Sequence, residues 1–158
     1  IISIHAGAGN IHKQWTTQGF VKIADWLASK GCQVIFVGSG RDLEKIKAIM
    51  TRLSHEAHNL GGSLSPGELM ALFHMSSLFL GNDSGPMHLA AVLGTPVVAL
   101  FGPTAPWRTG PYGSRHRVLR MERDCSPCFQ QNCETIECMT TIEVADVLRA
   151  VVEQLDKE

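Results

Sequence analysis

Short apolar runs alternate along the chain with longer stretches in which the apolar residues follow a helical period. The apolar runs predict strands at residues 1–5, 34–37, 57–60, 78–80, 97–101 and 118–120. Continuous apolar strands are typical of a sheet that is covered on both faces. Strands that are separated by single helices predict parallel pairing through right-handed crossovers.

The stretches between these strands carry the start and stop signals of helices. Residues 17–30 have one apolar face and end before Gly31, which is typical of a C-cap. Ser65 and Glu68 form a capping box at the start of another helix. Further helices are predicted at about residues 42–50, 86–93 and 142–155. The elements together predict an α/β domain with a Rossmann-like parallel sheet and helices on both faces.

Composition and charge narrow the classes of function. The chain has 158 residues, of which 44% are hydrophobic, so we expect one domain that spans residues 1–158. The formal net charge is −1 without a long basic block, which argues against a nucleic-acid partner. No apolar run approaches the ~18 residues of a membrane span. The chain opens inside a predicted strand at Ile1, which indicates a piece of a longer protein.

Ligands of such a sheet bind beyond the carboxyl ends of its strands, and three loops place polar groups there. The first loop, residues 5–13, contains Gly7 and Gly9, whose backbone N–H groups can approach an anion, and the mobile positive charge of Lys13. The loop matches neither a GxGxxG fingerprint nor a P-loop. Taken alone, it also fits a flexible turn with a solvated lysine.

The second loop, residues 81–88, joins a buried strand to a helix. Ser84 and Gly85 present free N–H groups at the positive end of the helix dipole, which favours a phosphate. His88 lies on the first helical turn, within reach of the same phosphate. Asp83 cannot attract a phosphate by charge, so it caps the helix, binds a sugar hydroxyl or holds the first loop. A plain helix cap with a hydrogen-bonded histidine is the alternative interpretation.

The third loop follows the strand at residues 97–101. Thr104 offers a hydroxyl in this loop and Gly102 an accessible backbone. Because all three loops follow parallel strands, we expect them to meet at one edge of the sheet as one anion-binding site.

In order and spacing, these motifs resemble the C-terminal domain of family 9 glycosyltransferases, the ADP-heptose:lipopolysaccharide heptosyltransferases. The similarity runs from residue 1 to about residue 113, and its matching segments are residues 7–9, 13–15, 38–40, 81–88 and 100–104. Its specific part is the pair Asp-Ser-Gly-x-x-His and Phe-Gly-Pro-Thr. The resemblance implies a two-domain GT-B fold, in which this chain is the donor-binding half and the N-terminal acceptor domain is absent.

The resemblance also implies roles for single residues. The donor-binding residues that it implies are Gly9, Lys13, Glu44, Leu64, Asp83, Ser84, Gly85, His88 and Thr104. Lys13 would act in catalysis by stabilising the charge of the leaving diphosphate, which Ser84, Gly85 and His88 would also hold. Asp83 would contact the heptose. Leu64 would pack on the adenine and Glu44 would bind the ribose.

For the function, the resemblance implies inverting transfer of heptose from ADP-heptose to the lipopolysaccharide inner core, with no cofactor required for catalysis. The acceptor hydroxyl needs a general base, which we expect in the N-terminal domain because the chain offers no clear candidate. We therefore expect the chain alone to bind a nucleotide sugar without transferring it. The family also implies a cytoplasmic location, with peripheral attachment to the inner face of the inner membrane left open.

Four of the five cysteines fall in a cysteine-rich loop at residues 124–139. Their spacing is that of a zinc knuckle in which cysteine replaces histidine, and four thiolates suit tetrahedral Zn²⁺. The candidate ligands are Cys125, Cys128, Cys133 and Cys138. Disulfides are disfavoured in a reducing cytoplasm, so a structural zinc site and a loop of reduced thiols both remain open.

Other functions also remain open on the residues alone. The chain fits a non-catalytic interaction module whose cysteine cluster binds zinc and a partner, or a family relative that uses another nucleotide-sugar donor. An unrelated Rossmann-like dehydrogenase or epimerase would carry GxGxxG after the first strand and an acidic residue at the end of the second. The chain has neither feature, since residues 38–40 are Gly-Ser-Gly.

Overall fold

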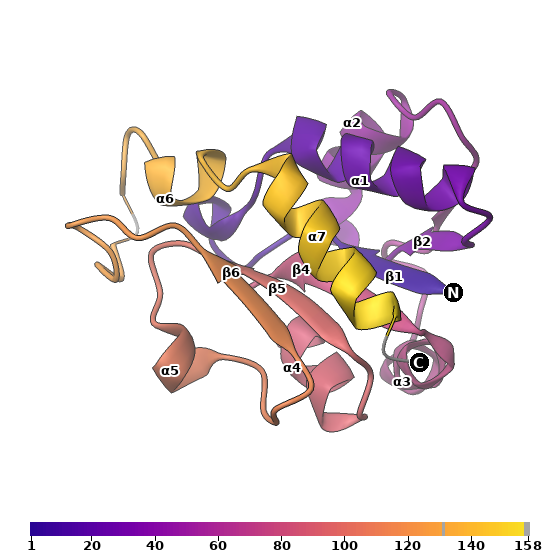
Figure 1. The fold of residues 1–158 in the computed structure, drawn as a ribbon. Coiled ribbons are helices and arrows are strands. Elements are labelled where there is room, and N and C mark those ends of the chain that lie inside the picture. The colour runs from indigo at the N-terminus through magenta and orange to yellow at the C-terminus, as the bar shows by residue number, and fades with distance from the viewer. Residues whose placement is uncertain (131, 157–158) are drawn as a thin grey trace.

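A computed structural model describes residues 1–130 and 132–156, and its strands form one parallel sheet (Figure 1). The strands are β1 (Ile2–His5), β2 (Val34–Phe36), β3 (His58–Asn59), β4 (Leu78–Asn82), β5 (Val97–Phe101) and β6 (Arg117–Arg120). Their order in the sheet is β3-β2-β1-β4-β5-β6, and Ile4 of β1 pairs with Phe36 on one side and Leu80 on the other. The strand order therefore reverses between β1 and β4, where open sheets of this type form a ligand crevice.

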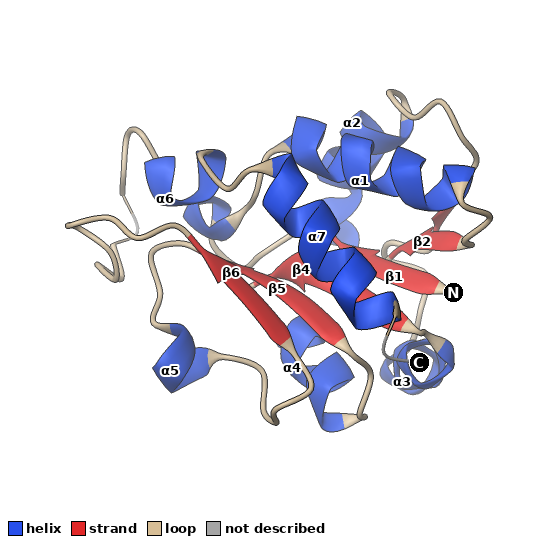
Figure 2. Ribbon diagram, viewed as in Figure 1, coloured by secondary structure: helices blue, strands red, loops and turns tan. Residues whose placement is uncertain are grey.

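Helices cover both faces of the sheet, as Figure 2 shows. One face carries α1 (Thr17–Ser29), α2 (Leu43–Met50) and α7 (Val144–Leu155), and the other carries α3 (Pro66–Met75) and α4 (Gly85–Val92). The shorter elements are α5 (Pro106–Thr109), α6 (Glu137–Thr140) and two 3₁₀ turns, η1 (Ile11–Lys13) and η2 (Gly40–Asp42).

The core consists of two apolar layers, one on each face of the sheet. Phe20 of α1 and Val151 of α7 pack with Ile4 in the first layer, and all three are fully buried. In the second layer Phe73 and Phe79 meet edge to face with ring centroids 5.2 Å apart. Each large side chain buried in this way contributes roughly 1.5–3 kcal/mol, so the two layers fix the positions of the strand ends that carry the site.

The predicted fold class is confirmed, and the differences lie at element ends. The capping box forms as predicted, with Ser65 N–H donating to Glu68 Oε2 at 2.8 Å. The strand expected at residues 57–60 is reduced to two exposed residues at the edge of the sheet, and the last helix begins at Val144 rather than at residue 142. The short elements η1, α5 and α6 were not predicted from the sequence. Across the described residues, no helix combines the length and apolar character needed to cross a membrane.

Candidate functional site

The polar residues of interest gather where β1, β4 and β5 end and α4 begins. Two cavities lie there, and both are lined by Gly9, Ser84 and Gly85. The Lys13 cavity, of about 440 Å³, is completed by Asn10, Lys13, Asp83, Pro103, Thr104, Phe129 and Gln130. The Asp42 cavity, of about 370 Å³, is completed by His5, Ala8, Ser39, Arg41, Asp42 and Pro86. Each volume falls within the range of small-molecule sites, and the start of α4 lies between them.

Asp83 ties the three predicted loops together in the Lys13 cavity. Its Oδ2 accepts a hydrogen bond from Lys13 Nζ at 2.7 Å and another from the Thr104 hydroxyl at 2.7 Å. Asp83 is buried, whereas the Lys13 side chain keeps 28% of its exposure. Of the interpretations left open for Asp83, contact with the first loop is therefore confirmed. Capping of α4 is wrong, because the N-cap is Ser84.

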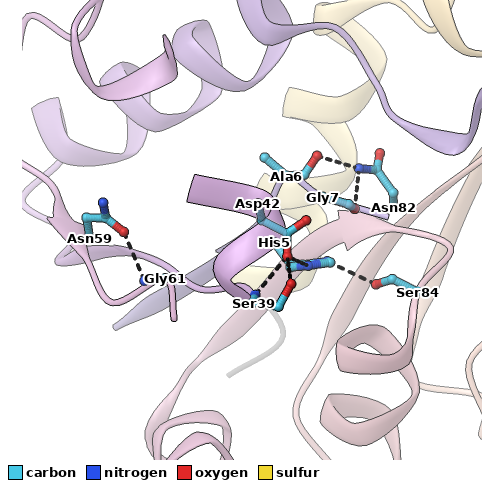
Figure 3. Close-up of polar contacts among 9 residues, drawn as sticks. All are labelled: His5, Ala6, Gly7, Ser39, Asp42, Asn59, Gly61, Asn82 and Ser84. Atoms are coloured by element: carbon cyan, nitrogen blue, oxygen red, sulfur yellow. Dashed lines mark hydrogen bonds and ion pairs between the residues drawn. The ribbon is translucent and has the colours of Figure 1, made fainter. Parts of the chain in front are cut away.

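The first loop is fixed to β4 by the fully buried Asn82. The amide nitrogen of Asn82 donates to the carbonyl oxygens of Ala6 and Gly7, each at 2.9 Å, and its Oδ1 accepts from the Trp15 N–H at 2.9 Å. Figure 3 shows the two bonds to the loop carbonyls. A buried amide whose donors and acceptor are all used is costly to move, so η1 and the Lys13 that it carries are held in place.

The start of α4 leaves its first turn open toward both cavities. Ser84 is the N-cap, but its side chain accepts no hydrogen bond from the helix. The hydroxyl oxygen instead lies 3.1 Å from His5 Nδ1 (Figure 3). Because the first N–H groups of a helix have no partner inside the helix, they remain available here to an anion.

His5 continues this line of contacts to Asp42 in the Asp42 cavity. His5 Nε2 lies 3.6 Å from Asp42 Oδ2, an ion-pair distance, and both residues are buried. The same carboxylate oxygen accepts the backbone N–H of Ser39 at 2.7 Å and its hydroxyl at 2.9 Å. Hydrogen bonding with His5, aided by Ser39, lowers the pKa of Asp42 to about 2 even though burial raises it. A side chain at Gly7 would collide with the Asp42 carboxylate, which explains the glycine at that position.

The cysteine-rich loop supplies one wall of the Lys13 cavity. The backbone N–H groups of Cys128 and Phe129 both donate to the carbonyl oxygen of Pro103, at 3.0 and 2.9 Å. The Ser126 hydroxyl donates to the carbonyl of Gly102 at 2.6 Å. These bonds hold the loop against the end of β5 and leave Phe129 at the cavity, 47% exposed and with a left-handed φ of 54°.

The predicted zinc site is not supported by the arrangement of the four cysteines. They line a small cavity of about 60 Å³, but no three Cys, His, Asp or Glu side chains of residues 1–130 and 132–156 are arranged to hold a metal ion. Cys125 is exposed while Cys138 is buried, and burial raises the pKa of the Cys138 thiol. Hydrogen bonding from the backbone N–H of Ile136 lowers the pKa of the Cys133 thiol, so the four thiols lie in unlike environments rather than in one set of equivalent thiolates.

The structure brings most of the sequence-predicted residues together. The residues that line one or both cavities are Gly9, Lys13, Asp83, Ser84, Gly85 and Thr104. His88 is half-buried on α4 and lines neither cavity. Leu64 packs partly buried against the core layer under α3 and α4, and Glu44 is exposed on α2.

The cavities also contain residues of distinctive chemistry that were not predicted from the sequence. They are His5, Arg41, Asp42, Phe129 and Gln130. The position of His5 at the end of the first strand was a usable signal, because ligands lie beyond strand ends. No local pattern reveals that residues 128 and 129 fold back onto residue 103.

Comparisons with known proteins identify the family of the chain. The sequence profile described as glycosyltransferase family 9 (heptosyltransferase) matches residues 1–138. Lipopolysaccharide heptosyltransferase 2 of Escherichia coli K12 is 34% identical over 113 residues, which cover 69% of this chain and 32% of that protein. Lipooligosaccharide heptosyltransferase 2 of Campylobacter jejuni (serotype O:2) is 28% identical over 156 residues, covering 94% of this chain and 49% of that protein.

A solved structure of E. coli ADP-heptose lipopolysaccharide heptosyltransferase II superposes with a TM-score of 0.87 at 28% identity. It covers 99% of this chain and 46% of that chain, and the matched part is the C-terminal half of a GT-B fold, as predicted. The chain thus spans between a third and half of the length of these curated relatives. Since the family profile matches most of its length, the chain belongs to glycosyltransferase family 9.

Proposed function

We propose that the chain binds a nucleoside diphosphate sugar across the start of α4. The observation that carries this proposal is that the two cavities share Gly9, Ser84 and Gly85. The diphosphate lies on these shared residues, where the helix dipole and free N–H groups favour an anion. The nucleoside then occupies one cavity and the sugar the other.

The chemistry of the walls supports one orientation of this ligand. The Lys13 cavity presents Asp83 and Thr104, which suit sugar hydroxyls, together with the exposed ring of Phe129, which suits the apolar face of a sugar. The Asp42 cavity presents Ser39 and Arg41, which lie beside the end of β2. The sugar therefore lies in the Lys13 cavity and the nucleoside in the Asp42 cavity.

The names of the relatives support a donor and a reaction. They are heptosyltransferases, and the superposed E. coli structure is that of an ADP-heptose lipopolysaccharide heptosyltransferase. We assign ADP-heptose as the donor and the lipopolysaccharide inner core as the acceptor of the whole protein. The transfer inverts the anomeric carbon by direct displacement and requires no cofactor.

In this reaction the chain stabilises the leaving group. Negative charge develops on the diphosphate as its bond to the sugar breaks, and the first turn of α4 and the Lys13 ammonium lie where they stabilise that charge. Removal of one such preorganised donor typically costs roughly 10²–10³ in kcat. Lys13 is thus the residue to which we assign a catalytic role.

The base for the acceptor hydroxyl lies outside these residues. Asp42 is a weak base because its pKa is about 2, and the Asp83 carboxylate is engaged by Lys13 and Thr104. A general base contributes roughly 10²–10⁴-fold, and positioning of the acceptor contributes on the order of 7–11 kcal/mol. The isolated chain consequently binds the donor without transferring the sugar.

Calorimetry with ADP, ADP-heptose, a UDP-sugar and NAD tests this proposal. We expect ADP to bind, ADP-heptose to bind more tightly, and the UDP-sugar and NAD to bind weakly. Binding of NAD in preference to ADP would contradict it.

A transfer assay on the isolated chain, alone and with an N-terminal half from a family member, tests whether the general base lies outside this chain. Acceptor-dependent transfer by the isolated chain would place the base within it.

A further inference from the structure

His5 is a buried imidazole to which the proposed function assigns no role. It ends β1 and is 4% exposed. Each ring nitrogen faces one partner, since Nδ1 lies 3.1 Å from the Ser84 hydroxyl oxygen and Nε2 lies 3.6 Å from Asp42 Oδ2. Figure 3 shows the resulting line from Asp42 through His5 to Ser84. The line ends at the shared residues on which the diphosphate is proposed to lie.

The protonation of His5 decides what the Ser84 hydroxyl offers to a ligand. In a neutral ring the proton lies on Nε2, facing the carboxylate, so Nδ1 accepts the Ser84 O–H. The hydroxyl hydrogen is then bonded to His5 and is not available to a ligand. In a doubly protonated ring, Nδ1–H donates to the Ser84 oxygen, and the hydroxyl hydrogen is free. Because a diphosphate accepts hydrogen bonds and cannot donate them, it favours the second state.

We propose that His5 is a positioning residue that takes up a proton when the diphosphate binds, so that the Ser84 hydroxyl donates to a phosphate oxygen. Asp42 balances the imidazolium charge from the far side of the ring. The inference rests on the proposed function, because it needs a diphosphate at the start of α4. Binding of the diphosphate would then take up one proton, and the buried His5 and Asp42 would help to hold the donor.

Other charged groups face the same region, and proton uptake by them must be distinguished from proton uptake by His5. Arg41 lines the Asp42 cavity, and the Lys13–Asp83 pair lies on the opposite side of Ser84. His88, on the first turns of α4, and His12, beside Lys13 on η1, are the other imidazoles near the site. Proton uptake by either of them would mimic the expected signal, so both are removed in control variants.

The test is calorimetric titration of the protein with ADP between pH 7.5 and 9, in pairs of buffers whose ionisation enthalpies differ. The difference in heat between the buffers gives the number of protons taken up. We expect uptake approaching about one proton per ADP, with an affinity that falls by up to roughly tenfold per pH unit in that range. The uptake is lost in His5→Gln and is retained in His88→Gln, in His12→Gln and in the control His74→Gln, an exposed position on α3.

Equal proton uptake in the wild type and His5→Gln would overturn the inference, as would loss of uptake in His88→Gln alone or in His12→Gln alone. If His5→Gln does not fold, ring ¹⁵N shifts of histidine-labelled wild-type protein decide the matter. They must show one buried imidazole becoming doubly protonated when ADP is added, and an unchanged set of ring shifts would contradict this. Absence of any ADP binding would overturn the proposed function itself, whereas ADP binding without proton uptake would overturn only the role of His5.

Discussion

The two cavities on either side of α4 share three residues but are built in different ways. The Asp42 cavity is made by strand ends and a short turn, and its carboxylate has three close polar contacts from His5 and Ser39. The Lys13 cavity takes part of its wall from the cysteine-rich loop, which is held at Pro103 by two backbone hydrogen bonds. The fold therefore dictates the side assigned to the nucleoside, while a separate loop shapes the side assigned to the sugar.

Substitution of Asp83 by Asn should separate the sugar side from the nucleoside side most clearly. The variant removes the carboxylate that faces the sugar side but keeps a side chain of the same shape. We expect the affinity for ADP-heptose to fall by about 10- to 100-fold, as for a lost hydrogen bond to a charged group, and the affinity for ADP to change less than about threefold. Calorimetry with both ligands measures the difference. An equal loss for the two ligands would place Asp83 at the diphosphate instead.

Substitution of Lys13 by Ala should affect both ligands, because Lys13 faces the shared part of the site. We expect ADP binding to weaken by ~1–3 kcal/mol if the contact is charge-assisted. The matched control is Lys47→Ala, an exposed lysine on α2, which should leave the affinity unchanged. Unchanged ADP affinity in Lys13→Ala would remove Lys13 from the site.

Substitution of Asp42 by Asn should show how much the contacts of its carboxylate with His5 and Ser39 stabilise the fold on the nucleoside side. The pKa of Asp42 is lowered from 3.8 to about 2, so its carboxylate stabilises the fold above pH 4 and loses that effect as the pH falls toward 2. We expect the Asp42→Asn substitution to lower the free energy of unfolding by about 1–2 kcal/mol at pH 7, and the difference to vanish near pH 2. Denaturant titrations across that range measure it, with the exposed Glu44→Gln as control. A difference independent of pH would exclude the contacts of the Asp42 carboxylate with His5 and Ser39 as its source.

Substitution of Phe129 by Ala should have the smallest effect on affinity, and it tests whether the cysteine-rich loop contacts the sugar. Loss of one aromatic contact is worth about 0.5–1.5 kcal/mol. We therefore expect ADP-heptose to bind about two- to tenfold more weakly, with no change for ADP. Tyr112→Ala, at an aromatic residue that is 83% exposed, is the control. Identical behaviour of both variants would show that the loop does not contact the sugar.

The sequence predicted the fold and the shared part of the site because both depend on local patterns. Apolar runs fixed the strands, and Ser84 and Gly85 follow one of them directly. The start of a helix after a buried strand is an anion site that needs no distant contact. Lys13 and Asp83 were likewise expected at the same sheet edge, although their direct ion pair was not specified.

The rest depends on contacts between residues far apart in the chain. The partner of Asp42 is His5, 37 positions away, and the loop around Phe129 rests on Pro103. The family resemblance implied Glu44 as the ribose ligand. Glu44 lies exposed on the first turn of α2, and its role stays a prediction, whereas Asp42 at the end of η2 lines the cavity. Spacing in the sequence did not indicate that Asp42 is turned toward the site.

A single ligand that spans both cavities across the start of α4 should be visible by amide NMR of the ¹⁵N-labelled chain, because the amides that line each cavity respond separately. With ADP, we predict shifts at Gly9, Ser84 and Gly85 and at Ser39 and Arg41 in the Asp42 cavity. With ADP-heptose, the same amides should shift, and those of Asn10 and Phe129 in the Lys13 cavity should join them. Shifts at Phe129 with ADP alone, without any at Ser39 and Arg41, would contradict this arrangement by placing the nucleoside on the other side.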